Sequence, residues 1–191
     1  MREKPLELFP NLEIGLSNGW ILIVLFFGVY GIMLIFFPKN AVARLYDRAG
    51  QRKHQLLHRL FIGILVLLLF ILMSLTPLKI GDEVFVIGIS FYSLGLIGFI
   101  IALENFKNTP VDQPVTSGLY SISRHPQQLA VSASLLGISI AIGSWPAFAV
   151  IILGVVEAHK KILAEEEACL KQYGESYKNY MERIPRYFMF F

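Results

Sequence analysis

The chain has 191 residues, of which 55% are hydrophobic and 16% charged, and its mean hydropathy is +0.59. Soluble domains carry about 25% charged residues, so this composition is shifted toward lipid and excludes a disordered chain. The single cysteine, Cys169, excludes an internal disulfide and a thiolate zinc site. The net charge is +3, but the basic residues stand between long apolar runs, which favours membrane topology over nucleic-acid binding as their explanation.

Apolar segments predict the membrane-spanning helices, because a span needs about 20 mostly apolar residues. Such segments cover residues 19–37, 60–76, 84–103, 127–142 and 145–156. The last two are separated by Gly-Ser-Trp-Pro at 143–146, where Ser144 suits the cap of the next helix and Pro146 its first turn. We therefore expect an all-α, polytopic membrane protein with five transmembrane helices, of which the last two form a helical hairpin.

The distribution of lysine and arginine predicts the orientation of these spans. Segments 38–59, 104–127 and 157–191 fall on one side of the membrane and carry 14 of the 17 basic residues. The positive-inside rule then places the amino terminus outside and the carboxyl terminus in the cytoplasm. Trp20 and Trp145 fall at the outer interface, where tryptophan is typical as a bilayer anchor.

The last 35 residues differ in composition from the spans. From Glu157 the helix of the fifth span is expected to continue into the cytoplasm as far as Gly174, which is a suitable helix stop. A second short helix is expected over 175–182, before Pro185. The sequence thus predicts a cytoplasmic, helical carboxyl-terminal extension.

A polar stretch at 115–126 joins the third span to the fourth on the cytoplasmic side. Ser123 is expected to cap the fourth helix, with Pro126 in its first turn. The free amides of such a helix start, beside Arg124 and His125, attract a carboxylate or phosphate. The alternative is a capped helix that anchors to lipid headgroups.

A second polar cluster, formed by Lys161, Glu165 and Glu166, lies on the continuing helix. The hairpin brings it to the same side as Arg124 and His125, so these five residues are expected to surround one pocket. The alternative is a solvated charged face. A separate pair, His54 and His58, has helical spacing but too few ligands for a metal, and headgroup contact explains it better.

The polar positions of the second half occur in a characteristic order. They are Ser117-Gly118-Leu119-Tyr120, Arg124-His125-Pro126, Glu165-Glu166, Tyr173-Gly174, Tyr177, Tyr180 and Ile184-Pro185-Arg186. With this order, residues 104–187 resemble the carboxyl-terminal half of the isoprenylcysteine carboxyl methyltransferases and the related phospholipid N-methyltransferases. The resemblance implies an N-terminal three-span membrane region at 1–103 and a methyltransferase-like catalytic half at 104–191.

The resemblance also implies an enzyme that transfers a methyl group from S-adenosylmethionine to a lipophilic small-molecule or lipidated acceptor in the membrane. The cofactor contacts that it implies are Asn105, Asp112, Gln113, Pro114, Val115, Tyr120, His125, Pro126, Gln127, Gln128, Glu165 and Glu166. The catalytic residues that it implies are Arg124, Lys161 and Glu165. No metal ion and no nucleic acid belong to this prediction.

Three positions depart from the family pattern, and one of them, Leu119 in place of the proline of Gly-Pro-Tyr, is expected to be harmless. Gln128 replaces the tyrosine of a His-Pro-x-Tyr sequence, so it can hydrogen-bond but cannot stack on a ligand. Lys161 replaces an arginine and lacks the planar fork that matches a carboxylate, which makes an isoprenylcysteine carboxylate a less suitable acceptor. The alternatives are phospholipid N-methylation, a membrane sterol or enone reductase that uses a nicotinamide cofactor, and a non-catalytic lipid-binding protein of the same fold.

Overall fold

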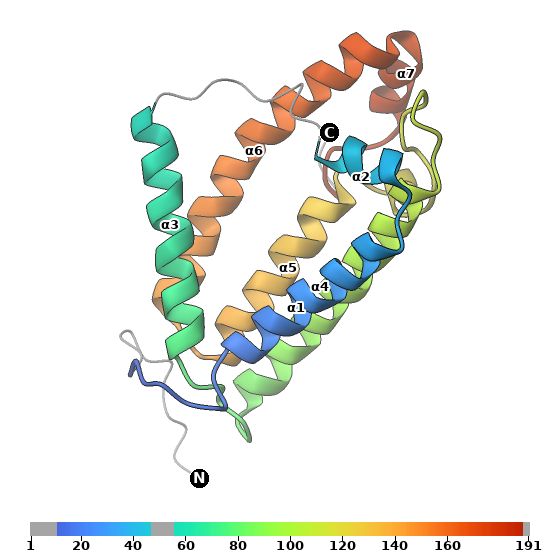
Figure 1. The fold of residues 1–191 in the computed structure, drawn as a ribbon. Coiled ribbons are helices and arrows are strands. Elements are labelled where there is room, and N and C mark those ends of the chain that lie inside the picture. Colours follow the sequence, from blue (N-terminus) through green and yellow to red (C-terminus); the bar gives the residue numbers. More distant parts are fainter. Residues whose placement is uncertain (1–10, 47–55, 189–191) are drawn as a thin grey trace.

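The computed structural model describes residues 11–46 and 56–188, and these residues are helical without a β-strand (Figure 1). The elements are α1 (Trp20–Ile35), α2 (Lys39–Leu45), α3 (Leu56–Leu75), α4 (Glu83–Lys107), the 3-10 helix η1 (Gly118–Ser121), α5 (Pro126–Ala141), α6 (Trp145–Tyr173) and α7 (Glu175–Arg183). An isolated bridge pairs Asn18 with Pro77. The predicted all-α fold is confirmed.

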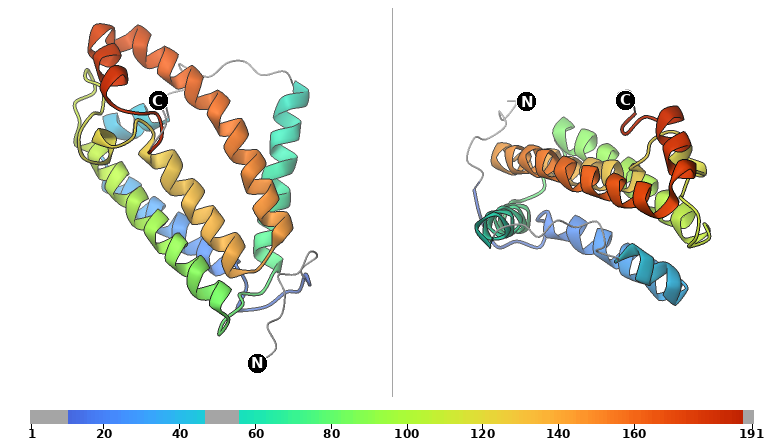
Figure 2. Two further views of the ribbon diagram at one scale, coloured as in Figure 1. Left: turned by 180° about the vertical axis from the view of Figure 1, so that it is seen from behind. Right: turned by 90° about the horizontal axis from the view of Figure 1, so that it is seen from above.

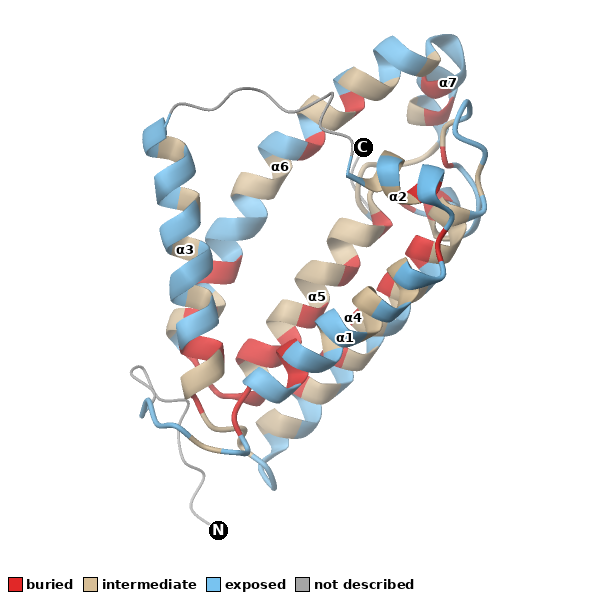
Figure 3. Ribbon diagram, in the orientation of Figure 1, coloured by how far each residue is buried: buried red, intermediate tan, exposed pale blue. Residues whose placement is uncertain are grey.

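The helices form two layers, which the view from above separates (Figure 2). One layer contains α4, α5 and α6, and the other contains α1, α2 and α3. The main core lies at the end of the molecule that holds the turn between α5 and α6, and buried residues of α1, α3, α4, α5 and α6 all meet there (Figure 3). Toward the other end α5 and α6 diverge, and α7 folds back from the tip of α6.

Small residues hold α4 and α5 close together. Gly88 lies against Ala141, Gly95 against Ser134, and Gly137 against the backbone of Tyr92. A Cβ atom at Gly137 would clash with that backbone, so only glycine permits this approach. Close contact between small residues is a common way for helices to associate in lipid, where apolar burial contributes little.

The hairpin between α5 and α6 forms as the sequence predicts. The Ser144 hydroxyl accepts a hydrogen bond from the Ala147 backbone N–H at 3.3 Å, and Pro146 lies in the first turn of α6. The helix then continues without interruption to Tyr173 and ends at Gly174, whose φ of +56° favours glycine. Both the continuation into the extension and the following helix, α7, are confirmed.

The prediction that Ser123 caps the fourth span is wrong. The N-cap residue of α5 is His125, and no side chain caps this helix. The Ser123 hydroxyl instead donates to the Arg186 carbonyl at 2.9 Å and accepts from the His125 N–H at 3.2 Å. The Ser123 hydroxyl therefore binds the segment after α7 instead of capping α5, and the spacing of residues near Ser123 does not reveal this distant contact.

Within the described residues, α3 and α4 are long and apolar enough to cross a membrane, and α1 is apolar but has 16 residues. Many large apolar side chains of these three helices are exposed, for example Val24, Leu67 and Leu94. Such surfaces fit contact with lipid rather than water. Each of the five predicted segments coincides with a helix, whereas five crossings and their orientation stay predictions.

Candidate functional site

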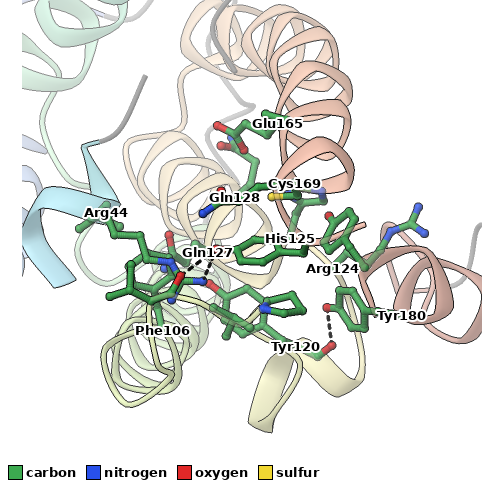
Figure 4. Close-up of a pocket in the computed structure, with 18 of the residues that line it drawn as sticks. Arg44, Phe106, Tyr120, Arg124, His125, Gln127, Gln128, Glu165, Cys169 and Tyr180 are labelled. Atoms are coloured by element: carbon green, nitrogen blue, oxygen red, sulfur yellow. Dashed lines mark hydrogen bonds between the residues drawn. The ribbon is translucent and has the colours of Figure 1, made fainter. Parts of the chain in front are cut away.

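A cavity of about 780 Å³ lies where α5 begins and α6 extends beyond it. Its walls come from α2, the end of α4, the loop that follows, the first turn of α5, α6 and α7. Figure 4 shows Arg44 and Phe106 on one side, Arg124 and Tyr180 on the other, and His125 and Gln127 between them. Ligand sites have volumes of roughly 300–1,000 Å³, so a cofactor-sized molecule fits here.

Most residues that the sequence assigns to a site line this one cavity. They are Pro114, Val115, Tyr120, Arg124, His125, Gln127, Gln128, Lys161 and Glu165. They come from the loop after α4, the start of α5 and the extension of α6, which are the three segments expected to converge. Four of the five residues of the two polar clusters, Arg124, His125, Lys161 and Glu165, therefore line one cavity, and Glu166 does not.

The other predicted cofactor contacts, Asn105, Asp112, Gln113, Pro126 and Glu166, do not line the cavity. Asn105 Oδ1 accepts from the Leu119 N–H at 3.0 Å and so holds η1. Asp112 is exposed on the loop, and the Gln113 carbonyl accepts from Arg44 Nη2 at 2.7 Å. Pro126 is buried at the first position of α5. Cofactor contact by these residues stays a prediction.

Glu166 is the centre of a buried ionic cluster behind the cavity wall. Its Oε1 lies 2.9 Å from Arg124 Nε and 3.2 Å from His125 Nε2, and its Oε2 accepts from Arg186 Nη2 at 2.7 Å. The Arg124 Nε–H pairs with the carboxylate by charge but is not aligned for a hydrogen bond, while its Nη1 donates to the Met181 carbonyl at 2.8 Å. Three basic groups thus share one carboxylate.

These contacts fix the charge of Glu166 and the tautomer of His125. Burial raises the pKa of Glu166, but hydrogen bonds from His125 and Arg186 and the charge of Arg124 lower it to about 2. Because the ionised carboxylate only accepts hydrogen bonds, His125 Nε2 must carry a hydrogen. In the neutral ring, Nδ1 is then an acceptor, and the imidazole is held in one orientation at the cavity wall.

The segment after α7 closes the cluster from outside. The Pro185 carbonyl accepts from the Arg124 N–H at 3.0 Å, and Tyr187 Oη lies 2.8 Å from His159 Nδ1 on α6. The Tyr180 hydroxyl donates to the Tyr120 carbonyl at 2.7 Å (Figure 4). The carboxyl-terminal segment thereby ties α7, α6 and the start of α5 together.

Gln127 provides an unused donor. Its Nε2 atom is buried and makes no hydrogen bond among the described residues, although the residue lines the cavity. Burial raises the pKa of the neighbouring Tyr120, and the Gln127 amide beside its hydroxyl lowers it, although the two groups are not well aligned for a hydrogen bond. A buried donor without a partner costs about 1–3 kcal/mol, which a bound ligand with an acceptor would offset.

The cavity rim carries the exposed pair Lys161 and Glu165, whose Nζ and Oε1 atoms are 3.5 Å apart. Glu157, one turn earlier, pairs instead with Lys160 at 2.7 Å and with His58 at 3.5 Å. Lys161 is therefore free to turn toward a ligand at the cost of only a weak surface ion pair.

Several cavity residues were not anticipated from the sequence. Tyr177 and Tyr180 belong to the recognised pattern, but nothing in it indicated that they line a pocket. Arg44 and Phe106 lie outside any pattern and reach the cavity only through the packing of α2 on α4. Among the described residues no three His, Cys, Asp or Glu side chains form a potential metal site, and His54 lies outside those residues.

Within the described residues the fold is all-helical, and two of its helices are long and apolar enough to cross a membrane, which is typical of helical membrane proteins. The chain matches the phospholipid methyltransferase family over residues 58–176, which is more than half its length, and it belongs to that family. The match covers α3 to α6, including the cavity segments after α4. No curated protein and no solved structure matches the chain. The protein is a membrane methyltransferase of this family, as the resemblance implies.

Proposed function

We propose that this methyltransferase uses S-adenosylmethionine, bound in the cavity, to methylate a lipid acceptor that reaches the site from the bilayer. The observation that carries the proposal is the convergence of the predicted contact residues on one cavity of about 780 Å³. Its polar lining combines donors at the start of α5 with a carboxylate on α6. A cofactor with a carboxylate, an amino group and ribose hydroxyls needs that combination.

The donor set of the cavity fits this cofactor. Gln127 offers a buried Nε2 donor that has no hydrogen-bond partner within the described residues, and Gln128 offers a second amide in the first turn of α5. Glu165 offers a carboxylate for an amino group or ribose hydroxyls, and Tyr120 and Val115 offer a buried surface for a ring. His125, Gln127 and Gln128 would hold the polar end, and Tyr120 the apolar end.

When bound, S-adenosylmethionine would supply an electrophilic methyl group on a sulfonium, which the acceptor would take up while S-adenosylhomocysteine departs as the leaving group. The protein's task is then to position the acceptor and to exclude water, which is where most of the rate enhancement of such reactions arises. An amine acceptor must first lose a proton, for which Glu165 and the acceptor nitrogen of His125 are the available groups.

For the acceptor we propose the amine headgroup of a phospholipid. A carboxylate acceptor needs a free planar guanidinium fork, and both arginines that line the cavity are engaged. Arg124 binds Glu166 and the Met181 carbonyl, and Arg44 binds loop carbonyls. Lys161 supplies a point charge for the lipid phosphate. The second candidate, an isoprenylcysteine carboxylate, is favoured by the ordered positions between Ser117 and Arg186.

The proposal includes the predicted topology: α1, α3, α4, α5 and the first part of α6 cross the membrane, with both the carboxyl terminus and the cavity on the cytoplasmic side. The aqueous cofactor then enters from the cytoplasm and the lipid from the bilayer. Residues 104–191 would form the catalytic half and residues 1–103 the membrane region, with α2 as a contribution of the latter to the cavity wall.

The test compares ligands on the full chain purified in detergent micelles. S-adenosylhomocysteine should raise the melting temperature, whereas NADPH should not. A shift with NADPH alone would support a reductase, and no shift with either would support a non-catalytic lipid-binding protein. Methyl transfer from labelled S-adenosylmethionine should occur to phosphatidylethanolamine and not to a prenylated cysteine, and the reverse preference would overturn the proposed acceptor.

The variant Gln127→Leu tests whether Gln127 contacts the cofactor. Because Gln127 Nε2 has no hydrogen bond within the described structure, its removal should not lower the melting temperature without ligand. It should weaken S-adenosylhomocysteine binding by about tenfold, which corresponds to one lost hydrogen bond. Asn179→Leu, at an exposed position of α7, is the control and should bind normally. Normal binding by Gln127→Leu would remove this residue from the cofactor site.

A further inference from the structure

Helix α2 forms one wall of the cavity although it precedes residue 58, where the family match begins. Asn40, Ala43, Arg44 and Leu45 of this helix line the cavity. Phe37 and Ala41 anchor it, since both are buried in one cluster with Phe99, Leu103 and Ala130 of α4 and α5. A short segment outside the family region is therefore fixed beside the site.

Arg44 connects this helix to the loop that follows α4. Its Nη1 donates to the carbonyls of Thr109 at 3.3 Å and Pro110 at 3.1 Å, and its Nη2 donates to the carbonyl of Gln113 at 2.7 Å. The guanidinium carbon also lies 4.9 Å from the centre of the Phe106 ring. The flat group is therefore held on its face by a ring and at its edge by three carbonyls.

Tyr173, at the end of α6, completes the arrangement. Its hydroxyl accepts from Arg44 Nη2 at 3.1 Å and donates to the Val111 carbonyl at 3.2 Å. Four of the five carbonyls from residue 109 to residue 113 are thus bound by Arg44 or Tyr173. Pro114 and Val115, which directly follow this loop, line the cavity.

We propose that Arg44 is a positioning residue for the methyltransferase site: it holds the loop of residues 109–113 so that Pro114 and Val115 close the cofactor cavity. This inference rests on the proposed function only for the identity of the ligand. The segment 109–113 forms no helix, and within the described residues its backbone N–H groups make two turn hydrogen bonds of 3.3 Å, from Thr109 to the Phe106 carbonyl and from Gln113 to the Pro110 carbonyl. Its position therefore depends on the side chains that bind its carbonyls.

The physical reason for an arginine is its shape. Hydrogen bonds from a charged donor are stronger than neutral ones, and a guanidinium offers five donors in a fixed fork. A lysine offers one compact charge that cannot reach carbonyls on two sides or stack on Phe106 in the same way. Lysine at position 44 should therefore hold the loop only in part, and alanine should not hold it.

The first measurement is hydrogen exchange of the full chain in detergent micelles without ligand. In Arg44→Ala, amides of 109–115 should exchange at least about tenfold faster, as expected when several charge-assisted hydrogen bonds are lost, while α4 and α5 stay protected. Arg183→Ala is the matched control, because this exposed arginine donates to a carbonyl of its own helix, that of Asn179. Tyr173→Phe should accelerate the same amides to a smaller extent.

The second measurement is S-adenosylhomocysteine affinity, together with the KM and kcat of methyl transfer. Arg44→Ala should raise the dissociation constant and the cofactor KM about tenfold or more and leave kcat within a few-fold, and Arg44→Lys should fall between. Unchanged loop exchange, or normal affinity in Arg44→Ala, would overturn the inference. If Arg44→Ala does not fold, Arg44→Lys and Tyr173→Phe test the inference by the same two measurements, loop hydrogen exchange and S-adenosylhomocysteine affinity. If the parent protein itself fails to bind S-adenosylhomocysteine, the proposed function fails, and loop exchange alone decides the role of Arg44.

Discussion

Single residues show how one carboxylate organises the cavity wall. Glu166 is 4% exposed and binds Arg124, His125 and Arg186, which come from the start of α5 and from the chain terminus. A buried carboxylate is tolerated only when it is paired and hydrogen-bonded, and this one is. Glu166 thus holds His125 and Arg124 at the cavity wall, while Gln127 and Glu165 line the cavity itself.

Glu166→Gln should destabilise the protein. The substitution leaves Arg124 buried without its countercharge, and breaking a buried pair in this way costs about 3–5 kcal/mol. Chemical unfolding in detergent at neutral pH measures the difference. Glu167→Gln, at the next and exposed position, is the control and should cost less than about 1 kcal/mol. Equal stability of both variants would mean that the cluster does not stabilise the fold.

Because of Glu166, we expect the stability of the protein to depend on pH in the acidic range. Because the pKa of Glu166 falls from its ordinary value of 4.5 to about 2 on folding, its stabilisation is complete above pH 4.5 and declines as the pH falls toward 2. The free energy of unfolding of the parent protein should fall over this range more steeply than that of Glu166→Gln. Parallel curves would show that the carboxylate is not preferentially ionised in the folded state.

We expect Lys161 to contribute to recognition of the lipid acceptor. It lines the cavity at the rim and is 55% exposed in its side chain, so Lys161→Ala should leave folding and cofactor affinity nearly unchanged. Turnover of the lipid acceptor should fall sharply, and Lys161→Arg should retain it. Labelled methyl transfer into organic-extractable product is the measurement, with Lys160→Ala as the exposed neighbour control. Parallel loss of cofactor binding in Lys161→Ala would move the residue into the cofactor site.

Among the elements, the pair α4 and α5 is fixed most closely, and glycine makes this possible. Gly88 and Gly95 of α4 and Gly137 of α5 each meet atoms of the facing helix. Because α5 carries His125, Gln127 and Gln128 at its start, the register of this pair sets where the cavity donors lie. The close contact between these two helices thus determines the geometry of the site at the start of α5.

Gly137→Ala tests that contact. The added methyl would meet the backbone of Tyr92, which cannot move without shifting α4, so stability should fall by about 1–3 kcal/mol. Gly154→Ala on α6 is the matched control, because open space surrounds that position, and alanine there should stabilise the helix by about 0.5–1 kcal/mol. Thermal unfolding in detergent distinguishes the two. Similar effects in both variants would show that the helices are packed less closely.

For the whole molecule, the orientation in the membrane follows from the proposal and is testable through Cys169. A membrane-impermeant maleimide should label this single thiol in inverted vesicles and not in intact cells, and efficient labelling of intact cells would overturn the orientation. Burial raises the pKa of the Cys169 thiol, so mildly alkaline buffer should speed the reaction. Cys169→Ser is the negative control.

Because Cys169 also lines the cavity, S-adenosylhomocysteine should slow its labelling. Undiminished labelling at saturating ligand would place the ligand elsewhere.

The sequence by itself determined the helices and the segments that converge. Apolar runs predicted the five long helices, Ser144 and Pro146 predicted the tight hairpin, and Gly174 predicted the end of α6. These features depend on interactions between near neighbours or on composition, which a sequence displays directly. The convergence of His125 and Glu165 followed from the hairpin, since two antiparallel helices joined by a short turn must bring their far ends to one side.

Only the tertiary structure decided which side chains face the cavity and which hold it. The pattern that joined Glu165 and Glu166 could not show that the first lines the cavity and the second is buried behind it. Ser123 has the spacing of a cap, yet a carbonyl 63 residues later binds its hydroxyl. Arg44 belongs to no pattern, and its hydrogen-bond partners lie 65 to 129 residues away. Such partners are chosen by packing between distant segments, which local propensity and spacing do not encode.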